Sequence, residues 1–333
     1  MSSKKDSFNS LDKHYMKLAI NLAKNQKGLT GINPSVGCVI VKNKKIVSYG
    51  ATNTNGRPHA ETIALSKNKK ENIGSTVYLT LEPCSHHGKT PPCTNALIKS
   101  KVKKVIYSIE DADTRCFNKS KKILKLNKIL TKSGLLTKEV RNLYKSYNYI
   151  KKNKFPYIIG KLACSSDLYI LRNNFHITNN HSRSVSHLLR YENQGILTSY
   201  KTINTDNPKL TCRIAGLEKF SPVKIVIDKD LKIKLNSYIV KYSTKPKTII
   251  FHNSKNISKI KNLKSKGVKL LNFKVEKDNY FDLKKIFKKI YKLGIHTLLV
   301  EGGKILTYNM ISKSLFNEFY LFKSNKILNN KGK

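Results

Sequence analysis

Apolar residues in the first half of the chain alternate between helical and strand spacing. Tyr15, Leu18 and Leu22 recur at helical spacing within residues 12–26, and Gly28 follows as a stop signal, which predicts a first helix. Two apolar runs separated by polar residues, 36–41 and 46–49, predict a hairpin. Further strands are predicted at 77–81 and 102–108, with helices at 60–69 and 94–99. This alternation favours a three-layer α/β/α domain.

Length and composition favour a second domain. A chain of 333 residues with 39% hydrophobic residues can fill two cores, and we place the domains at residues 10–154 and 155–333. The N-terminus is polar and the apolar runs are too short to cross a bilayer, so we expect a cytoplasmic protein with no membrane partner. Four of the six cysteines are scattered singly, which excludes a disulfide framework and fits a reducing compartment.

The net charge of +45 raises the question of a nucleic-acid partner. Only seven of the 65 basic residues are arginine, the side chain that specific phosphate and base recognition favours. The lysines are spread along the whole chain between asparagine and isoleucine. We therefore expect solvated lysine faces and no nucleic-acid partner, although the positive potential would help to collect a small phosphorylated ligand.

The chemistry-bearing motif is His59-Ala60-Glu61 followed by Pro83-Cys84 and Cys93. Two thiolates and an imidazole suit a tetrahedral zinc ion and leave its fourth position for water, as in catalytic sites. Residues two apart point to different sides of a helix, so His59 and Glu61 share one metal only if it lies in front of the first turn. Both ligand groups then lie at strand-to-helix junctions on one edge of the sheet.

A His-x-Glu motif followed by Pro-Cys and a second cysteine is typical of zinc deaminases. Zinc would lower the pKa of a bound water towards about 7 and give a hydroxide for hydrolytic deamination. Glu61 is then the catalytic proton carrier.

Other residues allow two interpretations. His86 and His87 could be extra ligands, substrate contacts or solvated loop residues, and Lys89 could bind a substrate phosphate. Gly302-Gly303 follows an apolar strand ending at Val300 and precedes a helix near residue 304, so it could hold a diphosphate or form an ordinary tight turn.

Residues 33–41, 59–61 and 79–93 resemble the bifunctional riboflavin-biosynthesis deaminase-reductases, and the long loop from Pro83-Cys84 to Pro91-Pro92-Cys93 is the specific part. The resemblance implies a cytidine-deaminase-like N-terminal domain. It also implies a set of substrate-binding residues there: Asn33 at the pyrimidine edge, His86 and Lys89 in the pocket, and Asp111 and Asp113 in a following loop.

The second half resembles the reductase domain of the same family, at residues 155–167 and 298–306. The implied fold is a dihydrofolate-reductase-like α/β domain that uses NADPH. The resemblance assigns substrate contacts to Arg190, Leu210, Arg213 and Glu301, and cofactor contacts to Lys161, Cys164, His176, Thr202, Asp206, Gly302 and Gly303.

The resemblance further implies two consecutive reactions. The zinc site would remove the 2-amino group of 2,5-diamino-6-ribosylamino-4(3H)-pyrimidinone 5′-phosphate. NADPH would then reduce the ribosyl group of 5-amino-6-ribosylaminouracil 5′-phosphate. The expected partner is this small phosphorylated pyrimidine, and we expect a homo-oligomer.

Two alternatives stay open. The first is a deaminase of nucleic acid such as tRNA, using the positive charge; the eight residues between the cysteines argue against it. The second is a deaminase joined to a decayed reductase domain. Its grounds are Leu168 where the family has glycine, His176 where it has tryptophan, a short loop between them, and a chain end at Lys333 that is compatible with truncation of the last strands.

Overall fold

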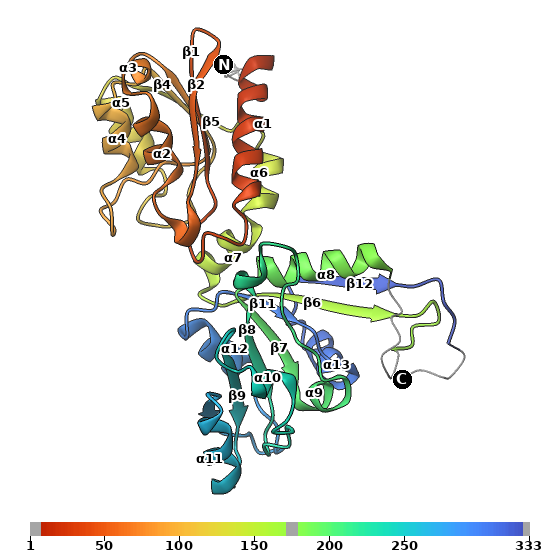
Figure 1. Cartoon of the computed structure of the whole chain (residues 1–333). Helices are drawn as coiled ribbons and strands as arrows, with labels where there is room; N and C mark the ends of the chain where they lie inside the picture. The colour runs from red at the N-terminus through yellow and green to blue at the C-terminus, as the bar shows by residue number, and fades with distance from the viewer. Residues whose placement is uncertain (1–7, 171–178, 329–333) are drawn as a thin grey trace. The chain divides into compact units, whose positions relative to one another are not determined.

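Two separate β-sheets organise the chain (Figure 1). The computed structural model describes residues 8–170 and 179–328, so the predicted cofactor residue His176 lies outside the described residues. The chain divides into two units, residues 1–153 and 154–333, and each contains one of the sheets.

Unit 1 contains a five-stranded mixed sheet in the order β2-β1-β3-β4-β5. Its strands are β1 (Gly37–Lys42), β2 (Lys45–Ala51), β3 (Thr76–Leu81), β4 (Lys104–Ile109) and β5 (Leu130–Ser133). β1 is antiparallel to both β2 and β3, and β3, β4 and β5 are parallel. β2 and β3 therefore run in the same direction, and the segments that follow them emerge at one edge of the sheet.

Helices cover both faces of this sheet, as Figure 1 shows, with α1 and α6 on one side and α2, α4 and α5 on the other. Glycines allow the close approach on each side: a Cβ on Gly37 would lie 1.9 Å from the Ala19 carbonyl oxygen of α1, and one on Gly50 2.5 Å from the Ala60 carbonyl oxygen of α2. The unit 1 helices are α1 (Ser10–Asn25), α2 (Ala60–Lys67), α3 (Lys69–Asn72), α4 (Cys93–Lys99), α5 (Lys119–Leu126), α6 (Thr137–Leu143) and α7 (Lys145–Asn153), with a 3-10 turn η1 (Thr54–Gly56).

The predicted elements of unit 1 are present, with bounds that differ by at most two residues. Helix α1 shows why the sequence pattern predicts a helix here. A capping box joins Asn9 and Asp12 at its start, and Tyr15, Ala19 and Ala23 are buried along one face. The predicted three-layer α/β/α arrangement is confirmed.

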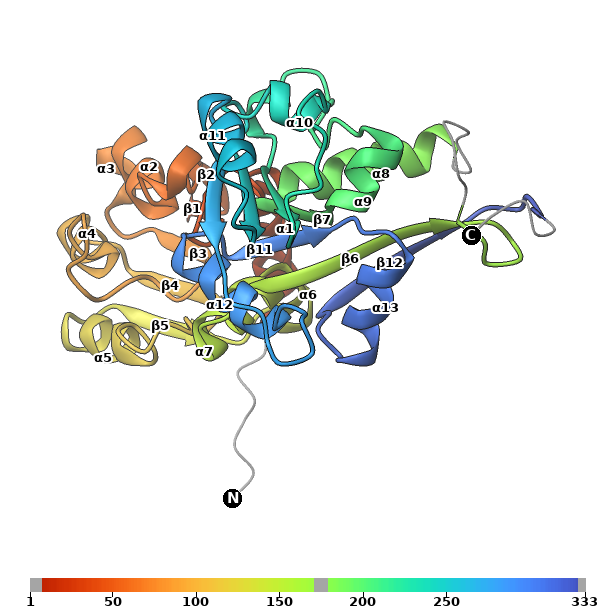
Figure 2. The ribbon, with the colours of Figure 1, turned by 90° about the horizontal axis from the view of Figure 1, so that it is seen from below.

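Unit 2 contains a seven-stranded sheet in the order β10-β9-β8-β7-β11-β6-β12, in which every neighbouring pair is parallel. Figure 2 shows β12 beside the long strand β6. The strands are β6 (Tyr157–Cys164), β7 (Gly195–Ser199), β8 (Val223–Ile227), β9 (Thr248–His252), β10 (Lys269–Asn272), β11 (Thr297–Val300) and β12 (Glu318–Lys323). The predicted α/β class of the C-terminal domain is confirmed.

The strand order creates a switch point in unit 2. From β7 the chain moves outward through β8, β9 and β10, and it then returns to insert β11 between β7 and β6. The segments that leave β7 and β11 diverge, and ligands of open α/β sheets bind at such points. The unit 2 helices are α8 (Asn180–Glu192), α9 (Tyr200–Asp206), α10 (Tyr238–Lys241), α11 (Ile257–Ser265), α12 (Leu283–Lys292) and α13 (Lys304–Ser312), with η2 (Glu218–Phe220).

No helix in the described ranges has the length and apolar character needed to cross a bilayer.

Candidate functional site

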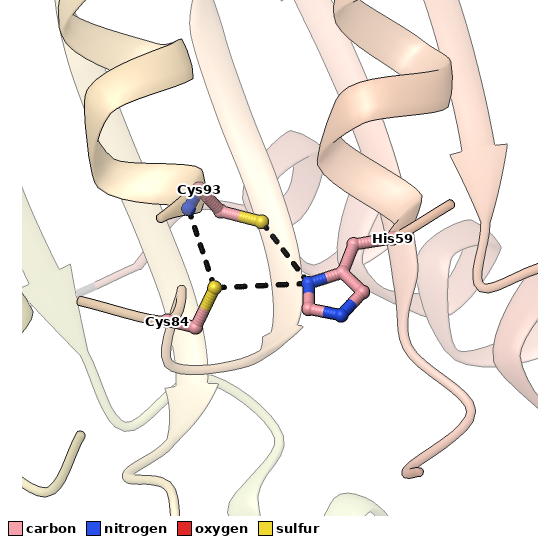
Figure 3. A group of neighbouring side chains, drawn as sticks. All are labelled: His59, Cys84 and Cys93. Carbon is pink, nitrogen blue, oxygen red and sulfur yellow. Dashed lines mark hydrogen bonds between the residues drawn. The ribbon is translucent and has the colours of Figure 1, made fainter. Parts of the chain in front are cut away.

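The three predicted metal ligands converge at the edge of the unit 1 sheet (Figure 3). His59 is the N-cap of α2, Cys93 is the first residue of α4, and Cys84 lies in the loop after β3. Their ligand atoms all lie within 4.8 Å of one another. His59 Nδ1 is 3.3 Å from Cys93 Sγ and 3.7 Å from Cys84 Sγ, and the Cys93 backbone N–H donates to Cys84 Sγ at 3.2 Å. The ligand atoms therefore meet in front of the N-termini of α2 and α4, as the spacing of His59 and Glu61 predicts.

The pKa values of Cys84 and Glu61 are shifted in ways that favour cation binding and proton transfer at this site. A hydrogen bond from Cys93 and another from His59 lower the pKa of Cys84 to about 4 and outweigh its burial. Glu61 is 4% exposed on the first turn of α2, and burial together with the neighbouring Cys84 thiolate raises the pKa of Glu61 to about 7. The site thus offers a ready thiolate ligand and a carboxyl group that can both take up and release a proton near neutral pH.

The donor set fits zinc. One imidazole nitrogen and two sulfurs are the ligand types of tetrahedral zinc sites, and three protein ligands leave one position for water. Glu61 is not a member of the three-residue group, so it remains available for proton transfer.

Asn33 lies on the loop before β1, against the turn that leads to His59. Its Nδ2 donates to the Gly56 carbonyl at 3.3 Å, and a Cβ on Gly56 would lie 2.1 Å from that same nitrogen. Gly56 also has a φ of +81°, which glycine adopts without strain. Position 56 therefore needs glycine for two reasons, and its carbonyl group fixes the orientation of the Asn33 amide.

The loop between the two cysteines carries His86 and Lys89. His86 Nδ1 lies 2.9 Å from Sγ of the buried Cys116. Lys89 is exposed, and Arg57 Nη1 donates to Thr90 Oγ1 of the same loop at 2.7 Å. His86 thus faces a third thiol and is outside the metal group.

Asp111 and Asp113 lie on the loop after β4, and both are bound by helix α7. Tyr147 donates to Asp111 Oδ1 at 2.7 Å, and Lys151 Nζ lies 2.8 Å from Asp113 Oδ2. Arg115 also binds both oxygens of Asp113, at 2.9 and 2.7 Å. The Arg115 and Lys151 cations hold the pKa of Asp113 well below its usual range, whereas burial raises the pKa of Asp111. Asp113 is therefore a carboxylate whose charge two neighbouring cations neutralise.

Glu82 organises the same loop, and no local sequence pattern indicates this role. The buried carboxylate accepts the backbone N–H groups of Asp111, Asn118 and Ser120 at 3.1–3.2 Å and the Ser120 hydroxyl at 2.7 Å. One backbone donor from the loop after β4 and two from the start of α5 converge on one side chain, which fixes the path of the loop.

In unit 2 a charged cluster surrounds Glu301, at the end of β11. Arg190 of α8 donates from Nε and Nη2 to the two Glu301 oxygens at 2.7 and 2.9 Å, and Lys161 Nζ of β6 lies 4.0 Å away. Burial alone would raise the pKa of Glu301, but Arg190 and Lys161 lower it to about 2. Three of the predicted ligand-binding residues therefore meet as one ion-pair network.

A cavity of about 150 Å³ lies at the switch point between β7 and β11. Thr202 and Asp206 of α9 and Gly303 before α13 line it, and a Cβ on Gly303 would lie 3.4 Å from Thr202 Oγ1. Lys201 and Lys304 also line the cavity and bring positive charge to it. A cavity with glycine at a strand-to-helix turn and lysines beside it fits a dinucleotide phosphate.

The remaining predicted residues of unit 2 lie outside these two groups. The Leu210 side chain is 3% exposed and belongs to a hydrophobic core cluster, so it can reach a ligand only through its backbone. Cys164 is buried at the end of β6, and burial raises its pKa. Leu168 has a φ of +64°, the left-handed conformation that favours glycine.

Several neighbours of the predicted residues were not identified from the sequence. His187 lies between Arg190 and Arg213, Tyr147 and Lys151 bind the two aspartates, and Lys201 and Lys304 line the cavity. His187 and Arg190 are three apart on one helix, which places them on one face and was the available signal. The contacts from α7 join residues 36 and 38 positions apart and left no local pattern.

Two protein-family models match the chain. Residues 9–109 match the cytidine and deoxycytidylate deaminase zinc-binding region, and residues 156–332 match the RibD C-terminal domain. The first match spans all three metal-group residues, and the second spans the charged cluster and the cavity.

Relatives match over nearly the whole chain. The riboflavin biosynthesis protein RibD of Aquifex aeolicus is 37% identical over 96% of this chain and 88% of its own length, and that of Escherichia coli is 32% identical over 95% and 88%. Among solved structures, Acinetobacter baumannii RibD has a TM-score of 0.85 at 26% identity, covering 97% of this chain and 89% of that one. A Thermotoga maritima diaminohydroxyphosphoribosylaminopyrimidine deaminase/5-amino-6-(5-phosphoribosylamino)uracil reductase has a TM-score of 0.83 at 28% identity, covering 96% and 88%.

Proposed function

The chain belongs to the RibD family of riboflavin biosynthesis proteins, and we propose how its residues divide the work of that family's two reactions. It is a bifunctional enzyme with a zinc-binding deaminase domain and a reductase domain. We assign the deaminase to residues 10–154 and the reductase to residues 155–333.

The deaminase substrate is the diaminopyrimidine ribosyl phosphate, as in the name of the Thermotoga maritima relative. The observation that carries the deaminase assignment is the convergence of His59, Cys84 and Cys93 within 4.8 Å beside the buried Glu61. A zinc ion held by these three residues would acidify a bound water molecule and so provide the nucleophile for an amino-bearing ring carbon.

Glu61 carries the protons of this reaction. It takes one proton from the attacking water and passes it to the ring nitrogen. It then takes the second proton from the added hydroxyl group and delivers it to the departing ammonia. Burial raises the pKa of Glu61, which favours its uptake of these protons. We assign the pyrimidine edge to the Asn33 amide, which the Gly56 carbonyl orients, and further substrate contacts to His86, Lys89, Asp111 and Asp113.

The reductase takes the deaminated product and NADPH. Thr202, Asp206 and Gly303, which line the switch-point cavity, would hold the cofactor together with the adjacent Gly302, and NADPH would supply a hydride for the ribosyl carbon. Lys161 and Cys164 contribute from β6, where Lys161 also faces Glu301. Arg190, Leu210, Arg213 and Glu301 form the substrate side, with Leu210 acting through its backbone. His176 completes the cofactor contacts by resemblance.

The two reactions can be separated in one experiment. The purified protein with zinc is given the diaminopyrimidine phosphate, and ammonia release is measured; NADPH oxidation is then followed on the aminouracil product. We expect removal of zinc by a chelator to abolish ammonia release and to spare NADPH oxidation, because the metal group of the described residues lies entirely in unit 1.

The opposite results contradict specific parts of the proposal. Ammonia release that persists without metal would remove the zinc site from the reaction. Absence of both NADPH binding and oxidation would favour the alternative of a decayed reductase domain. Tight RNA binding with a steep salt dependence would instead revive the nucleic-acid deaminase. A homo-oligomer stays a prediction, and light scattering tests it.

A further inference from the structure

His187 of α8 lies between two arginines in unit 2. Its Nδ1 is 3.2 Å from the Thr211 carbonyl oxygen, and its Nε2 is 3.3 Å from Nε of Arg213. Arg190, one helical turn further along α8, places Nη1 3.5 Å from His187 Nδ1 and 3.2 Å from the same Thr211 oxygen. These contacts connect the charged cluster of Glu301 to Arg213.

The contacts select one form of the imidazole ring. With the proton on Nδ1, His187 donates to the Thr211 oxygen and its Nε2 accepts the N–H of Arg213. The other neutral tautomer would place an N–H against Arg213 and a lone pair against the carbonyl oxygen. The doubly protonated ring would place a cation beside two arginines. Only the neutral Nδ1–H form satisfies both of the shorter contacts.

The two arginines differ in how many guanidinium nitrogens remain available to bind a ligand. Arg190 uses Nε and Nη2 on Glu301 and Nη1 on Thr211, so all three of its nitrogens are engaged within the protein. Arg213 is exposed, and in the described part of the chain its guanidinium shows a contact only through Nε. Its two terminal nitrogens therefore face solvent as a fork, the geometry that binds a phosphate monoester by two parallel hydrogen bonds.

We propose that His187 is a positioning residue of the reductase, which fixes Nε of Arg213 so that the two terminal nitrogens are directed at the 5′-phosphate of the substrate. Arg190 supports this arrangement by holding Glu301 and the Thr211 carbonyl. The inference rests on the proposed reductase function. A fixed guanidinium binds more tightly than a free one because less side-chain entropy is lost on binding.

The test compares 5-amino-6-ribosylaminouracil 5′-phosphate with the same compound lacking the phosphate. His187→Leu should raise the reductase KM for the phosphorylated substrate about tenfold, as expected for loss of one hydrogen bond to a charged group. It should leave kcat, the Kd of NADPH and the KM of the dephosphorylated compound unchanged. His187→Gln, which retains an acceptor for Arg213, should recover most of the affinity.

A control and a second variant make each outcome decisive. His181→Leu, an exposed histidine on the same helix, should change none of these constants. Arg213→Gln should raise the same KM, and adding His187→Leu to it should have no further effect. Equal losses for both substrates, or additive effects, would overturn the role of His187. An unchanged KM in Arg213→Gln would instead overturn the proposed phosphate contact of Arg213.

Discussion

Glu61 of unit 1 and Glu301 of unit 2 are both largely buried glutamates, but their surroundings shift their pKa values in opposite directions. Burial and the Cys84 thiolate raise the pKa of Glu61 to about 7. Glu301 experiences the same cost of burial, but the paired Arg190 and the nearby Lys161 lower its pKa to about 2. The partner, and not the depth of burial, decides which protonation state each glutamate adopts.

The difference separates two uses of a buried carboxylate. A group with a pKa near 7 exchanges protons readily at neutral pH, which suits Glu61 as an acid and a base in turn. A group that stays ionised cannot do this, but it can hold cations in place. Glu301 therefore contributes by fixing Arg190, which in turn fixes the Thr211 carbonyl that His187 contacts.

The largest effect is expected from removing the proton carrier of unit 1. Glu61→Gln keeps the size of the side chain and all three metal ligands, so the protein should retain zinc. Ammonia release should fall by about 10² to 10⁴, the usual contribution of general acid–base catalysis. Metal analysis and an ammonia assay on the same sample check both statements.

A matched control is Glu71→Gln, a half-exposed glutamate that pairs with Lys42 at 3.4 Å. Its ammonia release should match the unsubstituted protein. Full activity in Glu61→Gln would contradict the assignment of Glu61 as the proton carrier and, with it, the contrast with Glu301.

The second effect is on the stability of unit 2 and depends on pH. The pKa of Glu301 is lowered in the folded state, so its stabilisation is present above about 4.5 and is lost as the pH falls towards about 2. A decrease from 4.5 to about 2 corresponds to about 3 kcal/mol. Glu301→Gln should therefore be destabilised at pH 7, because Arg190 loses its buried partner, and the difference from the unsubstituted protein should shrink towards pH 3.

Denaturant unfolding of both proteins between pH 3 and pH 7, followed by circular dichroism, measures this difference. Glu276→Gln breaks an exposed pair with Lys285 and should give a small difference with little dependence on pH. A difference for Glu301→Gln that stays constant across the range would show that Glu301 is not held ionised by its neighbours.

The smallest effect concerns Leu168, which has the left-handed conformation that favours glycine. Its φ is +64° and the residue is 65% exposed. Leu168→Gly should stabilise unit 2 by up to about 1 kcal/mol, because the strain relieved slightly exceeds the entropy that glycine adds to the unfolded chain. The measurement is the thermal unfolding midpoint.

Leu188→Gly, the same change within helix α8, should lower that midpoint, because glycine costs about 1 kcal/mol in a helix. A lower midpoint for Leu168→Gly as well would show that the left-handed conformation of Leu168 costs less than the entropy that glycine adds to the unfolded chain.

The sequence determined most of unit 1 because its chemistry is local. His59 and Glu61 are two residues apart, Cys84 and Cys93 frame one loop, and strand-to-helix alternation placed both groups at one sheet edge. The elements predicted from the sequence lie within two residues of their observed bounds, because apolar spacing and caps such as Asn9 and Asp12 act over a few residues. Helices α5 to α7 and strand β5 were not predicted. The resemblance extended this to the substrate loop and to the second domain.

Only the tertiary structure decided how those residues are held. It joins Asp111 to Tyr147 and Asp113 to Lys151, brings Glu82 to three backbone donors, and places His187 between Arg190 and Arg213. The tertiary structure also raises the pKa of Glu61 and lowers that of Glu301. Hydrogen bonds and charges act through space between residues up to 111 positions apart, as in the pairing of Arg190 with Glu301, so no local pattern in the sequence contains them.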